Sequence, residues 1–216
     1  MFKLPESTVV GKIVPKNAFD SFTNKGQKKL LSEKVQRIFW SNRIAYDNVY
    51  LQGKDVVEIQ VFQIILKEKA KIKEIISFIE RAIPYNIIFW VEFMNEFYIS
   101  TSVKHSNPQN ENQSVIDYTF TSDWKLIDEN PYVLELKNNL DLVFERFCNQ
   151  LKSIETDTVS IKDLVEKQKS SEAILRQIKK LTTEINRCQQ FNRKVELNMK
   201  LKELQSKLKF FKDSGD

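Results

Sequence analysis

The chain has 216 residues, of which 41% are hydrophobic, 11% aromatic and 29% charged, and its formal net charge is +5 at pH 7. This composition predicts a folded protein with a sizeable core. Four glycines, one histidine and two cysteines exclude a glycine-rich phosphate loop, a dinucleotide-binding fingerprint and a zinc site with clustered ligands. We therefore expect neither a metal nor a cofactor.

Two short helices are expected near the start of the chain, over residues 16–22 and 28–34, in a segment that is otherwise irregular. Branched and aromatic residues at 35–45 then predict a strand, and turn-forming residues separate it from a second strand at 56–66. This second strand is apolar on both faces. Such a strand belongs in the middle of a sheet, where both of its faces are covered.

Residues 72–83 have the spacing of an amphipathic helix, which Pro84 ends. Three further strands are expected, at 86–93, 97–104 and 114–121. A helix at 136–151 is expected to cover one face of the sheet. The predicted fold class is α+β, a mixed β-sheet with flanking helices that is followed by a C-terminal helical extension.

The C-terminal segment carries the basic excess of the chain. Residues 158–216 hold 14 Lys and Arg against 8 Asp and Glu, a net charge of +6, which leaves −1 for the rest. Two apolar stripes run along this segment in shifted registers, one through Ile174, Ile178, Leu181, Ile185, Cys188, Val195 and Met199, the other through Leu197, Leu201, Leu204, Leu208 and Phe211. Because polar residues at 189–194 separate the registers, we favour an antiparallel helical hairpin over a single long coiled-coil helix.

These patterns divide the chain into an α+β body at residues 1–153, a linker at 154–159 and a basic helical hairpin or coiled coil at 160–212. The longest apolar stretch is too short to span a bilayer, and the first residues have no apolar core of a signal peptide. The two cysteines, Cys148 and Cys188, lie within helical patterns, so we expect reduced thiols. The predicted location is the cytoplasm.

Several short strings are spread in order over almost the whole chain. They are Phe2-Lys-Leu-Pro-Glu-Ser-Thr8, Pro15-Lys16 with Phe19, Ile38-Phe-Trp40, Glu58-Ile-Gln-Val-Phe62, Ala82-Ile-Pro-Tyr85, Tyr118-Thr-Phe-Thr-Ser-Asp-Trp124 and Gln190-Phe-Asn-Arg-Lys-Val-Glu-Leu-Asn198. Their order and spacing resemble the bacterial and archaeal family called domain of unknown function 4391. The resemblance implies no established reaction. It implies neighbouring genes for helicases and DNA methyltransferases, in restriction-like or phage-defence clusters.

One pattern is related to catalysis. In metal-dependent nucleases of the PD-(D/E)xK type, a strand carries an acid that holds Mg²⁺ and, two residues later, a lysine. Glu58 and Gln60 stand at these positions, with Asp47 or Asp55 as the upstream acid. Gln60 cannot supply the positive charge, so we interpret the pair as structural, or as a decayed nuclease site, and an enzyme is the less favoured hypothesis. His105 is interpreted as a surface residue.

The C-terminal segment supplies the binding candidates. The candidates for nucleic acid are Lys179, Lys180, Arg187, Arg193, Lys194, Lys200 and Lys202, although charged outer faces are also normal in coiled coils. The candidates for a protein partner are Ile174, Ile178, Leu181, Ile185, Leu201, Leu204 and Leu208.

The favoured function is that of a non-catalytic accessory protein that docks to a partner in a DNA-processing, restriction-like or phage-defence system. The partner would be a protein, such as a helicase or a DNA methyltransferase, or a second copy of the chain. Non-specific nucleic acid is a further candidate, and no membrane is expected. Two alternatives stay open: a nuclease-type enzyme centred on Glu58, and a simple oligomerisation module.

Overall fold

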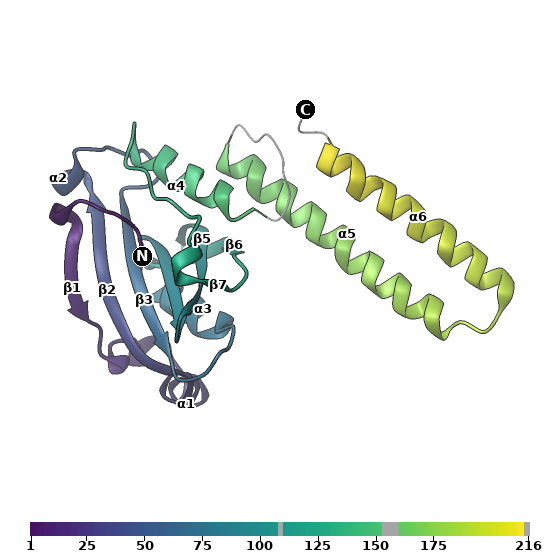
Figure 1. The fold of residues 1–216 in the computed structure, drawn as a ribbon, viewed down its shortest axis with the longest axis horizontal. Coiled ribbons are helices and arrows are strands. Elements are labelled where there is room, and N and C mark those ends of the chain that lie inside the picture. Colours follow the sequence, from purple (N-terminus) through teal and green to yellow (C-terminus); the bar gives the residue numbers. More distant parts are fainter. Residues whose placement is uncertain (108–109, 153–159, 214–216) are drawn as a thin grey trace. The chain divides into compact units, whose positions relative to one another are not determined.

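The computed structural model describes residues 1–107, 110–152 and 160–213 (Figure 1). The chain forms two compact units, Met1–Leu151 and Lys152–Asp216, which we call the body and the hairpin. The linker predicted at 154–159 lies outside the described residues. No described helix is long and apolar enough to cross a membrane.

The body contains a seven-stranded mixed sheet. Its elements are 3₁₀-helix η1 (Glu6–Thr8), β1 (Val9–Ile13), 3₁₀-helix η2 (Lys16–Phe22), α1 (Lys25–Lys34), β2 (Val35–Ala45), α2 (Tyr46–Val49), β3 (Glu58–Leu66), α3 (Lys73–Ala82), β4 (Asn86–Phe93), β5 (Glu96–Asn107), β6 (Asn110–Thr121), β7 (Lys125–Leu126), 3₁₀-helix η3 (Ile127–Glu129) and α4 (Leu140–Gln150). The predicted α+β class is therefore confirmed.

The sheet has the strand order β1-β2-β3-β4-β5-β6, with β7 beside β5. Strands β3 and β4 are parallel and are joined through α3, and the other pairings are antiparallel. Strand β3 lies between β2 and β4, and its residues are buried or nearly so along its whole length. The expectation of a central strand that is covered on both faces is confirmed.

The two faces of the sheet carry separate layers of helix. On one face, Phe62, Phe89 and Ile79 of α3 belong to one buried cluster that also includes Phe19 of η2. Because side chains alternate along a strand, Trp90 points to the opposite face. There the ring of Phe2 packs edge-on against Trp90 and against Phe147 of α4, with ring centroids 5.7 and 5.4 Å apart.

Several boundaries differ from the predicted ones. The segment expected to be irregular contains β1, which becomes a strand by pairing with β2. Helix α1 begins earlier than predicted, because the side chains and backbone of Asn24 and Gln27 form a reciprocal capping box. Helix α4 begins at Leu140 and not at 136, because Asn139 accepts a hydrogen bond from the N–H of Leu142 and so caps the helix.

The hairpin consists of α5 (Ile161–Arg187) and α6 (Phe191–Asp213). Ser160 caps α5 by accepting a hydrogen bond from the N–H of Asp163. The two helices run antiparallel and side by side (Figure 1), and Arg193 of α6 forms an ion pair with Glu184 of α5 at 3.4 Å. The segment is thus two helices joined by a short turn, as the shifted apolar registers predict.

Candidate functional site

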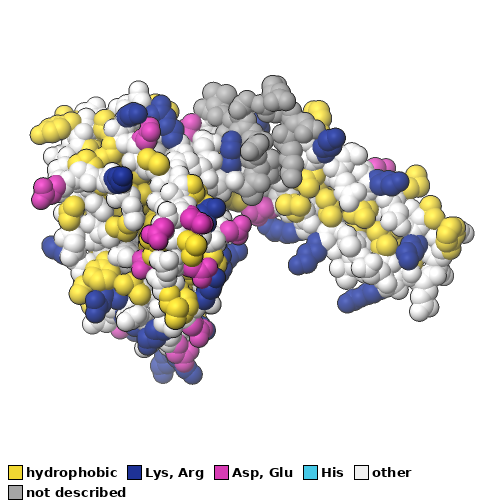
Figure 2. All heavy atoms as spheres, in the orientation of Figure 1, with side chains coloured by type: hydrophobic (Ala, Val, Ile, Leu, Met, Phe, Trp, Pro, Cys, Tyr) yellow, Lys and Arg dark blue, Asp and Glu magenta, His cyan; other side chains and the backbone are white. Residues whose placement is uncertain are grey.

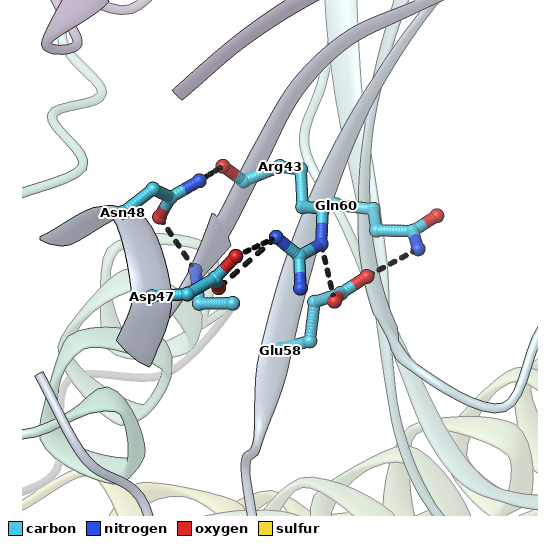
Figure 3. A network of polar contacts seen from close by, with 6 residues as sticks. Arg43, Asp47, Asn48, Glu58 and Gln60 are labelled. Atoms are coloured by element: carbon cyan, nitrogen blue, oxygen red, sulfur yellow. Dashed lines mark hydrogen bonds and ion pairs between the residues drawn. The ribbon is translucent and has the colours of Figure 1, made fainter. Parts of the chain in front are cut away.

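The predicted nuclease-like residues belong to a polar cluster in the body, on the neighbouring antiparallel strands β2 and β3 (Figure 3). Arg43 of β2 lies opposite Gln60 of β3 in the strand register. The Nε of Arg43 donates to Oε2 of Glu58 at 2.7 Å, and its Nη1 donates to both carboxylate oxygens of Asp47, at 3.0 and 2.8 Å. The Nε2 of Gln60 donates to Oε1 of Glu58 at 2.6 Å. Each oxygen of Glu58 therefore accepts a hydrogen bond from the chain itself.

The inner residues of this cluster are buried, and Asp47 at its outer end is exposed. Glu58 and Gln60 are each only 6% exposed. The hydrogen bonds from Arg43 also hold the pKa of Asp47 below its ordinary value. Asn48 donates to the carbonyl of Arg43 and accepts from the N–H of Ala45, so that α2 is fastened to the end of β2. A buried carboxylate needs such partners, because leaving it unpaired is costly.

Asp55, the other upstream acid that we considered, is bonded elsewhere. Its backbone N–H donates to Oδ1 of Asp141 at 2.9 Å, and those of Lys54 and Val56 donate to the same carboxylate. Burial by itself would raise the pKa of Asp141, but these three N–H groups bring it below the ordinary value. Asp141, which sequence reasoning missed, therefore anchors the segment before β3 to the start of α4.

A second polar contact, also missed from the sequence, lies within the body. The Nζ of Lys104 on β5 donates to Oε2 of Glu80 at 2.8 Å, and to the carbonyl oxygens of Glu80 and Ile83 at 3.0 and 2.7 Å. Burial raises the pKa of Glu80 and lowers the pKa of Lys104, and the pairing opposes both shifts. Since both side chains are almost completely buried, the pair caps the C-terminal end of α3 and joins it to β5.

His105, by contrast, is an exposed residue. Its Nδ1 lies 2.9 Å from Oδ2 of Asp117 on the neighbouring strand β6, and more than half of its side chain is exposed.

The basic candidates for nucleic acid lie on several sides of the hairpin. Lys179 and Lys180 are consecutive, so they point about 100° apart around α5. Arg193 is engaged by two acids, Glu184 and Glu196. Lys180 and Lys200 line one groove of the hairpin, and Lys180 also lines a second hollow together with Arg187. Figure 2 shows basic and hydrophobic side chains interspersed over the hairpin face that it displays.

The apolar candidates for partner binding lie on the sides of α5 and α6 that turn toward each other. In this seam Ile185 and Leu197 are buried, with 8% and 2% of their surface exposed. The remaining candidates are only partly buried: they are Ile174, Ile178, Leu181, Leu201, Leu204 and Leu208. In a pair of helices, each apolar side chain of the seam is covered by the facing helix only, so part of its surface stays exposed to solvent.

Helix α6 has a second apolar face. Phe191, Val195 and Met199 are spaced four residues apart and expose 79%, 43% and 61% of their surface. Val195 lies two residues before the buried Leu197, which turns the helix by about 200° and so points Val195 away from the seam. We call these three residues the outer stripe. The sequence pattern joined Val195 and Met199 to the stripe of α5, but the turn at residues 188–190 interrupts that continuity.

The comparisons with known proteins give a single relationship. A family model described as "Domain of unknown function (DUF4391)" matches residues 2–208. No curated protein and no solved structure has a significant match to the chain. Because the matched residues span nearly the whole sequence, the chain belongs to the domain of unknown function 4391 family.

Proposed function

We propose that this protein is a non-catalytic accessory protein that docks through its hairpin to a protein of a DNA-processing, restriction-like or phage-defence system. The single observation that carries the proposal is the outer stripe of α6. Phe191, Val195 and Met199 form an i, i+4, i+8 row of exposed apolar side chains on a helix whose other apolar face already packs in the seam. Rows of this kind are how amphipathic helices anchor in the grooves of their partners.

The energy of burial makes the outer stripe a suitable anchor. Burying apolar surface contributes roughly 25 cal/mol per Å², and a large apolar side chain contributes about 1.5–3 kcal/mol when it is fully buried. Phe191 and Met199 expose most of their surface, so a groove that covers them gains much of this energy. Lys202, one turn beyond Met199, and the basic excess of the hairpin would steer an acidic partner surface toward the stripe.

A helicase or a DNA methyltransferase is the proposed kind of partner, in line with the family resemblance. The nuclease-type alternative centres on Glu58. Both oxygens of Glu58 accept hydrogen bonds from Arg43 and Gln60, and Asp47 is bound to the same Arg43. These bonds support a structural role for the cluster, and they are the reason that we prefer the accessory function.

The proposal is tested by affinity capture of the tagged full chain from its native cells, followed by mass spectrometry. We expect the double variant Phe191→Glu/Met199→Glu to lose the partner that the wild type enriches. Both positions are exposed, so the circular dichroism of the variant should match that of the wild type. Leu175→Glu is the control, because it places a glutamate at an exposed apolar position of α5 outside the outer stripe.

Two results would contradict the proposal. Equal enrichment of the partner by the wild type and the double variant would exclude the outer stripe as the docking surface. Enrichment of the chain itself, with no other protein, would favour the oligomerisation module instead.

A further inference from the structure

A groove of about 460 Å³ lies on one face of the hairpin, and no residue of the outer stripe is among the described residues that line it. Leu181 of α5 and Leu204 of α6 supply its apolar lining. Its charged lining comes from Lys180 and Glu184 on α5 and from Lys200 and Glu203 on α6. The groove therefore combines an apolar seam with equal numbers of positive and negative side chains.

This balance of charge argues against a nucleic acid in the groove. Phosphate backbones attract surfaces on which lysines and arginines prevail. Here Glu184 and Glu203 equal Lys180 and Lys200 in number, so the charged side chains that line the groove show no excess of positive charge. A protein surface with matching charges of both signs suits the groove better.

The charges along α6 match those of a second α6 running in the opposite direction. Glu196, Lys200, Glu203 and Lys207 follow one another at spacings of four, three and four residues, which keeps them on one side of the helix. Their signs alternate. When the row is reversed end to end, every acid meets a base: Glu196 faces Lys207, and Lys200 faces Glu203. A two-fold axis passing between residues 201 and 202 would form each of these pairs twice.

From these observations we infer that the groove is covered by the hairpin of a second copy of this chain. The two hairpins pack face to face and antiparallel as a four-helix bundle, which covers the partly exposed seam residues Leu181 and Leu204. The inference rests on the proposed function, in which the hairpin is the docking element, and extends it. Because the described lining of the groove includes none of Phe191, Val195 and Met199, the dimer would carry two copies of the outer stripe, one for each partner molecule.

The test is the molar mass of the full chain in solution, measured by light scattering and by sedimentation at several concentrations. We expect a dimer whose dissociation constant rises about tenfold in Lys200→Glu and in Glu203→Lys, because each change replaces two symmetry-related attractions by two repulsions. The double variant Lys200→Glu/Glu203→Lys should regain the wild-type dissociation constant, since the swapped charges again face each other. Lys179→Glu, on another side of α5, is the matched control and should leave the dimer unchanged.

A monomeric wild type would overturn the inference, and so would a dimer that neither single charge reversal weakens. Failure of the double variant to recover would also overturn it, because only a symmetric partner restores both pairs. These outcomes are separable from the capture experiment, which changes Phe191 and Met199 and not the groove. Loss of the dimer with capture intact would leave the proposed function standing.

Discussion

The body and the hairpin differ in how their apolar side chains are buried and how their buried charges are paired. In the body, β3 and β4 are covered on both faces, and the buried acids Glu58 and Glu80 are paired with Arg43 and Lys104. The body also exposes apolar side chains, among them Tyr50 and Met94, but in the hairpin the exposed Phe191, Val195 and Met199 form one row on a helix, and the seam between the helices is only partly buried. The difference indicates that the body has its own core, whereas the hairpin has surfaces that another molecule can bury.

The largest effect is expected from removing the hairpin. Deletion of residues 158–216 should abolish both partner capture and self-association, while the body keeps its fold. All three tryptophans, Trp40, Trp90 and Trp124, belong to the body, so their fluorescence reports its unfolding alone. A truncated chain that no longer unfolds cooperatively in denaturant would show that the hairpin is part of the core.

The next effect is expected at the buried ion pair of the body. Lys104→Met leaves Glu80 buried without its partner, and such a loss costs about 3–5 kcal/mol of the free energy of unfolding. Adding Glu80→Leu should recover much of it, because the double variant removes the unpaired charge. Lys73→Met is the control, because Lys73 is an exposed lysine of α3, the helix that carries Glu80. Tryptophan fluorescence in denaturant gives the values, and a loss in Lys104→Met no larger than that of the control would contradict a structural role.

The smallest effect is expected at Asp141. Asp141→Asn replaces a carboxylate that accepts three backbone N–H groups, at a cost of about 1 kcal/mol because the site is partly exposed. The pKa of Asp141 is lowered in the folded protein, so its contribution is fully present above the ordinary pKa of an aspartate and is lost as the pH falls through the lowered value.

The difference in the free energy of unfolding between the wild type and Asp141→Asn should therefore shrink as the solution is made acidic. Denaturant unfolding followed by tryptophan fluorescence at several pH values measures it. Asp128→Asn, at an exposed acid of η3, is the control and should show a smaller difference. A difference that stays constant from neutral to acidic pH would mean that the carboxylate charge of Asp141 does not stabilise the body.

The sequence by itself determined the elements that depend on local patterns. The predicted strands at 35–45 and 86–93 match β2 and β4, because runs of branched and aromatic residues end there at clear turn signals. The turn between α5 and α6 was also predictable, because the apolar register shifts where polar residues interrupt it. The acid and amide at Glu58 and Gln60 were recognised as a polar pair, and the structure joins them by a hydrogen bond.

Only the tertiary structure decided which distant groups meet. Arg43 binds Glu58, Lys104 binds Glu80, and Asp141 accepts hydrogen bonds from the N–H groups of residues 54–56. The partners in each contact are far apart in the sequence, so local sequence patterns do not predict that they meet. The tertiary structure also decided that Val195 and Met199 face outward, because the direction of an apolar stripe depends on the helix packed beside it. Periodicity sets the shape of an element, but long-range packing selects the face that is buried and the charges that are paired.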